Sequence, residues 1–205
     1  MYPVFLKLSG RRVLLVGGGR VAAGKLAGLL ADGAHVTVVA PEIRPELHQP
    51  GVTIVRRSFE ETDLDDVWYV VTAAPSEVNM QVVAAAESRH VFVNAVDDPS
   101  HATAYAGSVV RRAGVTIAFS TDGRAPALAG LLREALDAWL PADLDTWMVA
   151  SDAARREWKQ SRVPMEERRP MLLETLNRLY EEKDSNRLPN SNSQLPNGER
   201  GIGSW

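Results

Sequence analysis

The chain has 205 residues, of which 45% are hydrophobic and 24% are charged, and its formal net charge at pH 7 is -3. These values are typical of a soluble globular protein and give no indication of disorder or of general nucleic-acid binding. No run reaches the roughly 18 apolar residues of a membrane span, and the N-terminus lacks a secretory pattern, so we expect a cytoplasmic protein without membrane contact. The lack of cysteine excludes disulfides, thiolate nucleophiles and cysteine-held metals.

The first half of the chain alternates apolar runs with helical patterns. Residues 12–16 (RVLLV) form a continuous apolar run, as in a parallel strand that is covered on both faces. Further strands are predicted at residues 35–40, 52–56, 67–71 and 91–95, and helices at residues 21–32 and 77–88. Strands and helices that alternate at this spacing predict right-handed crossovers and a parallel sheet. We therefore expect residues 1–112 to form a Rossmann-like, doubly wound α/β domain.

The second half is predicted to be helical after one more strand at residues 115–119. Apolar residues recur at three- and four-residue steps after Pro126, which fits the first turn of a helix. Two further helices are predicted near residues 144–158 and 172–180, with Pro164 and Pro170 in the link between them. We assign residues 113–141 to a dimerisation and substrate region and residues 142–183 to a small helical C-terminal domain.

Three short helices offer little core of their own. We expect their apolar surface to pack against the first domain or against a second subunit, and we predict a homodimer. The last 22 residues, 184–205, include 13 that are Asn, Ser, Gly or Pro. Such a composition buries too little apolar surface to offset the entropy of ordering, so this segment is predicted to be a disordered tail.

A glycine-rich segment follows the first predicted strand and precedes the first predicted helix. Residues 17–22 read GGGRVA, a G-x-G-x-x-A form of the dinucleotide-binding fingerprint. Gly17 permits the tight turn, Gly19 lets the backbone approach a pyrophosphate, and Ala22 lets the helix pack closely on the sheet. N–H groups at the helix start would hold the anion. The alternative is a plain turn between a strand and a helix.

The usual acidic residue at the end of the second strand is replaced by Ala40 and Pro41. Glu42 could turn back to the ribose, main-chain groups at Pro41 could serve instead, or Arg44 could meet a 2′-phosphate. The residues alone therefore leave the choice between NAD and NADP open.

Two polar segments follow later strands at the edge where open α/β sheets bind ligands. Asp97, Asp98 and His101 could supply a general base or part of a metal site, although Asp before Pro is also common in turns. The loop at residues 120–126 (STDGRAP) could hold a carboxylate or phosphate at a helix N-terminus, and it could equally be a capping loop.

Taken together, residues 2–42, residues 91–99 (VFVNAVDDP) and residues 117–136 (IAFSTDGRAPALAGLLREAL) resemble the precorrin-2 dehydrogenase and sirohydrochlorin ferrochelatase family. This family is the dehydrogenase module of siroheme synthase. The resemblance implies a homodimer with an NAD-binding domain that oxidises the tetrapyrrole precorrin-2 to sirohydrochlorin with NAD⁺. Some members also insert ferrous iron as a co-substrate, and no dedicated metal site is expected.

The resemblance also implies roles for individual residues. Asp97 matches the family's general base. The residues expected to bind the cofactor are Gly17, Gly18, Gly19, Arg20, Val21, Ala22, Pro41, Glu42, Thr72 and Ala73. The residues expected to bind the substrate are Asn94, Ser120, Thr121 and Arg124. Arginine forks such as that of Arg124 suit the carboxylate arms of a tetrapyrrole.

The sequence departs from the family pattern at two places. Gly107 and Ser108 stand where the family usually has Pro-Ala, and residues 72–75 (TAAP) replace the usual Ala-Thr-Asp-Asp. Two other functions remain open: a dinucleotide-sensing module without catalysis, and a dehydrogenase for another polycarboxylate.

Overall fold

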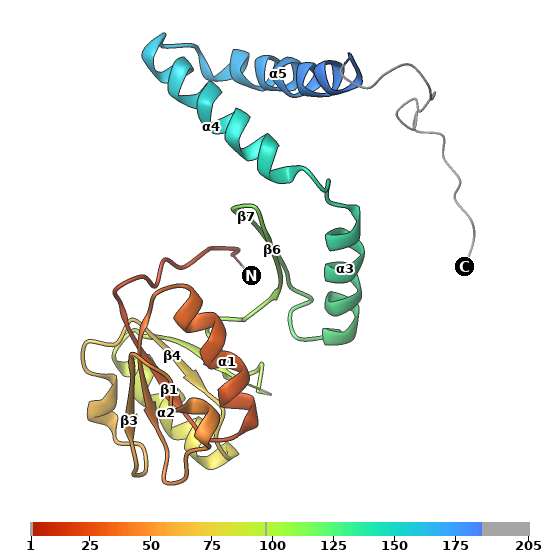
Figure 1. The fold of residues 1–205 in the computed structure, drawn as a ribbon. Coiled ribbons are helices and arrows are strands. Elements are labelled where there is room, and N and C mark those ends of the chain that lie inside the picture. The colour runs from red at the N-terminus through yellow and green to blue at the C-terminus, as the bar shows by residue number, and fades with distance from the viewer. Residues whose placement is uncertain (1, 97, 186–205) are drawn as a thin grey trace. The chain divides into compact units, whose positions relative to one another are not determined.

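The computed structural model describes residues 2–96 and 98–185 (Figure 1). Asp97 and residues 186–205, which include most of the predicted tail, lie outside the described residues. The chain divides into two compact units. The first contains the residues up to Val110 together with Ile117–Ala138, and the second contains Arg111–Thr116 together with the residues from Trp139 on. The domain boundaries given above remain predictions.

The first unit contains a five-stranded sheet in the order β3-β2-β1-β4-β5. The strands are β1 (Arg12–Val16), β2 (His35–Val39), β3 (Val52–Val55), β4 (Tyr69–Thr72) and β5 (Phe92–Ala95), and all pairs are parallel. The connections contain the helices α1 (Arg20–Ala31) and α2 (Ser76–Ser88) and the short 3-10 helices η1 (Pro45–Leu47) and η2 (Glu61–Leu64). The predicted Rossmann-like parallel fold is confirmed.

The central strand β1 is buried because both faces of the sheet are covered. Val13 and Leu15 belong to one apolar cluster, which includes Leu26 of α1. Leu14 and Val16 belong to a second cluster, which includes Val82 of α2. Side chains alternate between the two faces of a strand, so a continuous apolar run is required when both faces are packed.

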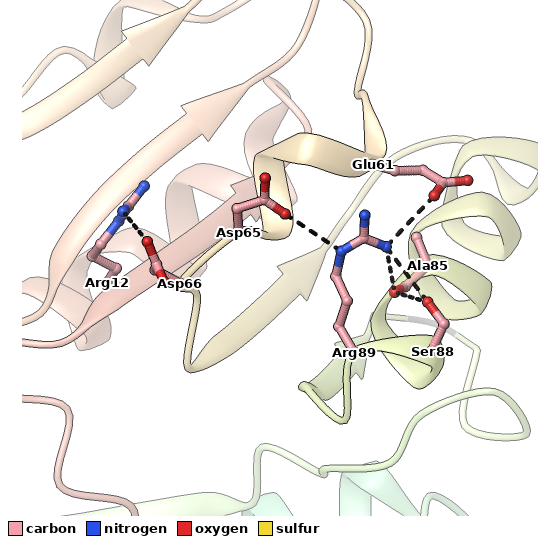
Figure 2. Close-up of polar contacts among 7 residues, drawn as sticks. All are labelled: Arg12, Glu61, Asp65, Asp66, Ala85, Ser88 and Arg89. Carbon is pink, nitrogen blue, oxygen red and sulfur yellow. Dashed lines mark hydrogen bonds and ion pairs between the residues drawn. The ribbon is translucent and has the colours of Figure 1, made fainter.

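Ion pairs join the end of α2 to the segment before β4 (Figure 2). Arg89, which follows the last residue of α2, lies 3.5 Å from Glu61 and 3.6 Å from Asp65, and it also donates to the carbonyl of Ala85. Arg12, at the start of β1, lies 3.5 Å from Asp66. Arg89 is 29% exposed, whereas its carboxylate partners and the Arg12–Asp66 pair are largely exposed, and ion pairs open to water contribute little to stability.

A two-stranded hairpin follows β5, and the sequence predicts only its second strand. It consists of β6 (Ser108–Arg112) and β7 (Val115–Phe119), of which only the second was expected. Ala113 and Gly114 connect them, and both have positive φ (50° and 80°), as in the two-residue turns that match strand twist. The small residue pair Ala-Gly was the available signal for this turn.

The remaining elements are helical, as predicted: α3 (Pro126–Trp139), α4 (Leu144–Gln160) and α5 (Met165–Ser185). Helix α5 begins earlier than predicted and contains Pro170 as its sixth residue, where the missing N–H removes one internal hydrogen bond from the helix. Trp147 of α4 packs edge-to-face on Tyr180 of α5, with ring centroids 6.2 Å apart. Within the described part of the chain, no helix is both long and apolar enough to cross a membrane.

The pair Arg57–Asp63 gives a prediction for the dependence of stability on pH. Burial alone would raise the pKa of Asp63, but hydrogen bonds from Arg57 (2.6 and 2.8 Å) and from the Glu60 N–H (2.9 Å) lower it below the ordinary 3.8. At neutral pH, Asp63→Asn should lower the free energy of unfolding by about 1 kcal/mol. Thermal denaturation should then show a Tm that is lower by roughly 2–4 °C.

Because the folded-state pKa lies below the unfolded-state pKa, this stabilisation is complete above pH 3.8 and is lost as the pH falls further. The gap in Tm between the native protein and Asp63→Asn should therefore narrow below that pH. A gap that widens in acid would contradict this account.

Candidate functional site

The glycine turn after β1 is fixed by close contact with the segments that follow two neighbouring strands. A Cβ on Gly17 would lie 2.4 Å from the carbonyl oxygen of Ala73, and a Cβ on Gly18 would lie 1.8 Å from that of Glu42. Gly17 also has a φ of 124°, which side chains rarely permit. Only glycine fits at either position.

Gly19 has a different role from the two glycines before it. It has an extended backbone, and a Cβ at this position would meet nothing within 4 Å. The first hydrogen bond of α1 runs from the Ala23 N–H to the Gly19 carbonyl, and no side chain caps the helix. The N–H groups of Arg20, Val21 and Ala22 therefore precede the first hydrogen bond of the helix and have no partner within it. A phosphate fits there.

A cavity of about 370 Å³ lies beside this turn, at the carboxyl ends of β4 and β5. Its lining residues come from the start of α1, from the start of α2 and from the loops after both strands: Val21, Ala73, Ala74, Ser76, Asn79, Val96 and Asp98. Ligands bind at this edge in open parallel sheets. The cavity, the open space at Gly19 and the uncapped helix together fit a dinucleotide.

Thr72 and Asn79 form a buried polar pair under the cavity. The Thr72 hydroxyl donates to Asn79 Oδ1 at 2.5 Å, and the Ala74 N–H donates to the same oxygen at 3.2 Å. Thr72, predicted to bind the cofactor, has no exposed surface, so it can act only through Asn79. Asn79 was not predicted from the sequence. The available signal was a polar side chain on the face of α2 that also carries the buried Val82 and Ala86.

Asp98, which follows β5, is held by hydrogen bonds from two neighbouring side chains. The carboxylate of Asp98 lies 2.8 Å from Nδ1 of His101 and accepts the Ser100 hydroxyl at 2.7 Å. The hydrogen bond from His101, followed by that from Ser100, lowers the pKa of Asp98 below its ordinary value. Asp98 therefore stays ionised at neutral pH. Asp97, the predicted base, lies outside the described residues. Of the three residues of the alternative metal site, the structure therefore describes only Asp98 and His101, which are hydrogen-bonded to each other.

The predicted substrate loop lies next to the turn after β5. A Cβ on Gly123 would lie 3.0 Å from two atoms of the Pro99 ring. The Thr121 side chain accepts the Ala125 N–H at 3.1 Å, and the Ser120 hydroxyl accepts the Asp122 N–H at 3.2 Å. These hydroxyls thus fix the loop, while the Arg124 side chain is 84% exposed.

Asn94 and Gly107 make contacts with the backbone near the predicted substrate loop. The Asn94 amide nitrogen donates to the Ala104 carbonyl at 3.0 Å, and its buried oxygen has no hydrogen-bond partner in the described part of the chain. A Cβ on Gly107 would lie 2.6 Å from the Phe119 carbonyl, so this departure from the family pattern permits a close backbone contact.

The end of β2 carries the remaining predicted cofactor residues. Pro41 and Glu42 are exposed there. Arg44, the alternative partner for a 2′-phosphate, is held by Glu46 at 2.8 Å.

Residues 4–108 match a protein family described as "Putative NAD(P)-binding". The chain belongs to this family. It is 41% identical to the siroheme synthase of Photorhabdus laumondii over 172 residues, which are 82% of this chain and 37% of that protein. The identity to the siroheme synthase of Tolumonas auensis is 40% over 161 residues, 77% of this chain and 34% of the relative. The chain thus spans little more than a third of these relatives.

Among solved structures, a protein titled "SirC, precorrin-2 dehydrogenase" is similar over 85% of this chain and 88% of its own, with a TM-score of 0.65 and 27% identity. Together these matches support the family predicted from the sequence and confirm a nicotinamide dinucleotide as the cofactor.

The two glycines Gly18 and Gly19 give a matched pair of variants. Gly19→Ala should fold with a Tm close to that of the native protein, because its Cβ enters open space, but it should weaken dinucleotide binding by about tenfold or more. Gly18→Ala should instead destabilise the fold, because its Cβ overlaps backbone. Thermal denaturation and NADH titration measure the two effects. Undiminished binding by Gly19→Ala would contradict the assignment of this space to the pyrophosphate.

Proposed function

We propose that the chain oxidises precorrin-2 to sirohydrochlorin with NAD⁺. The observation that carries the proposal is the cavity beside the glycine turn, lined by Ala73, Asn79 and Asp98 at the carboxyl ends of β4 and β5. The similarity to the protein titled precorrin-2 dehydrogenase, which extends over 88% of that chain, supports the same reaction. The curated siroheme synthases support the same pathway.

The cofactor is proposed to bind across the glycine turn. The N–H groups of residues 20–22 would hold the pyrophosphate, while Gly17 and Gly18 keep the turn close to the sheet. When bound, the nicotinamide ring supplies the acceptor for a hydride from the substrate. Glu42 favours NAD, since its carboxylate suits ribose hydroxyls and repels a 2′-phosphate, and Arg44 is already paired with Glu46.

The oxidation also releases protons, which need an acceptor near the substrate. Asp98 is a poor acceptor, because hydrogen bonds from His101 and Ser100 stabilise its charged form. We therefore assign the base to Asp97, as the family resemblance implies. The loop containing Ser120, Thr121 and Arg124 is proposed to bind the carboxylate arms of the substrate, with Asn94 holding the adjacent chain from below.

A direct assay tests this function. Anaerobic incubation of the protein with enzymatically generated precorrin-2 and NAD⁺ should yield NADH and the sirohydrochlorin spectrum in equal amounts, with NADP⁺ a poorer oxidant. Ferrous iron added afterwards tests the proposed second reaction, insertion of the metal as a substrate. Binding of NAD⁺ without turnover would overturn the function in favour of a sensor or of a dehydrogenase for another polycarboxylate.

The two adjacent aspartates provide a matched control within the assay. Asp97→Asn should lower kcat by about a hundredfold or more while dinucleotide affinity stays unchanged. Asp98→Asn removes a charge of the same sign one residue away and should have a much smaller effect. Equal losses in the two variants would contradict the assignment of the base to Asp97.

We further propose that the chain forms a homodimer through α3. Leu128, Leu131 and Leu132 lie on one face of this helix and are 50%, 63% and 43% exposed. An apolar stripe of this kind is costly in water. A second copy of the chain would cover it in a symmetric contact.

Light scattering tests the dimer. The native protein should have the mass of two chains, and Leu131→Glu should raise the dissociation constant by roughly a hundredfold or more. Arg133→Gln changes the net charge by the same amount on another side of α3, and it should leave the dimer intact. A monomeric native protein would contradict the proposal.

A further inference from the structure

Asn79 is buried in the first turn of α2, with 6% of its surface exposed, and it lines the cavity beside the glycine turn. The orientation of its amide group follows from its neighbours. A backbone N–H can only donate, so the atom that faces the Ala74 N–H at 3.2 Å must be the oxygen. The Thr72 hydroxyl donates to the same oxygen.

The oxygen of the Asn79 amide is therefore used by hydrogen bonds within the protein. Two donors, Thr72 and Ala74, occupy Oδ1 and hold the side chain in one rotamer. The amide nitrogen makes no hydrogen bond to any of the described residues. It is not one of the fully buried polar atoms that lack a partner, so part of its surface is accessible. The polar group that Asn79 offers to the cavity is therefore a pair of N–H donors.

The order of the strands indicates which part of the cofactor meets these donors. With the pyrophosphate at the turn after β1, the two halves of a dinucleotide extend over strands on opposite sides of β1. Glu42, after β2, lies on the side that receives the adenosine ribose. The cavity with Asn79 lies on the side of β4 and β5. The nicotinamide half therefore extends over the cavity.

We propose that Asn79 donates a hydrogen bond to the nicotinamide riboside half of the cofactor, and that Thr72 is the positioning residue that turns the amide nitrogen toward it. This inference rests on the proposed function, because it places the nicotinamide over β4 and β5. Ribose hydroxyls and the carboxamide oxygen are the acceptors in that half. Asn79 thereby fixes the ring against the substrate side of the site.

The test compares two ligands that share the adenosine and pyrophosphate groups and differ in the other half. Asn79→Asp keeps an oxygen for Thr72 and Ala74 but removes the donors. Its NADH affinity, measured by fluorescence titration, should fall by about tenfold, while its affinity for ADP should stay within about twofold of the native value. Asn79→Ala repeats the comparison without a negative charge and should give the same split.

Gln81→Glu is the matched control, because it adds the same charge at an exposed position of α2 outside the cavity. It should change neither affinity. Thr72→Val, which lacks the orienting hydroxyl, should weaken NADH binding by a smaller factor, whereas Thr72→Ser should bind as the native protein does.

Unchanged NADH affinity in both Asn79 variants, or equal losses for NADH and ADP, would overturn the proposed contact. Equal losses would indicate that Asn79 only supports the fold of the site. A native protein that fails to bind NADH would instead overturn the proposed function itself, so the two failures are distinguishable.

Discussion

The site depends on the close approach of the turn after β1 to the backbone segments that follow β2 and β4. The Cα atoms of Gly17 and Gly18 lie so near the carbonyl groups of Ala73 and Glu42 that neither position has room for a side chain. This contact fixes the start of α1 at the carboxyl edge of the sheet. The N–H groups of the helix and the adjoining cavity are then presented on the same side.

Around the cavity, polar groups divide into those that hold the structure and those that remain for ligands. Thr72 and Asp98 are engaged by neighbouring groups, and each orients another side chain, Asn79 and His101 respectively. The hydroxyls of the loop at residues 120–126 also bind the loop's own backbone. Few polar groups around the cavity thus remain to contact ligands, and the neighbouring residues restrict how those groups can move.

Much of the fold could be predicted because its causes are local. Each central strand is a short apolar run, and the glycines stand at the strand-to-helix junction, so the parallel sheet and the dinucleotide turn follow from neighbouring residues. The sequence marks Asn79 only as a polar side chain on the buried face of α2, because its contacts with Thr72 and Ala74 exist only in the folded chain. Strand β6 was missed because SVVRR is only partly buried and carries two charges. The engagement of Asp98 by His101 is likewise a property of the folded turn.

The central claim is that one dinucleotide spans the glycine turn, with its adenosine half at β2 and its nicotinamide half over β4 and β5. A crystal structure of the protein with NAD⁺ tests it most directly. The account predicts the pyrophosphate at the N–H groups of residues 20–22 and the nicotinamide in the cavity lined by Ala73 and Asn79. An adenine ring in that cavity, or a cofactor bound away from the turn, would contradict it.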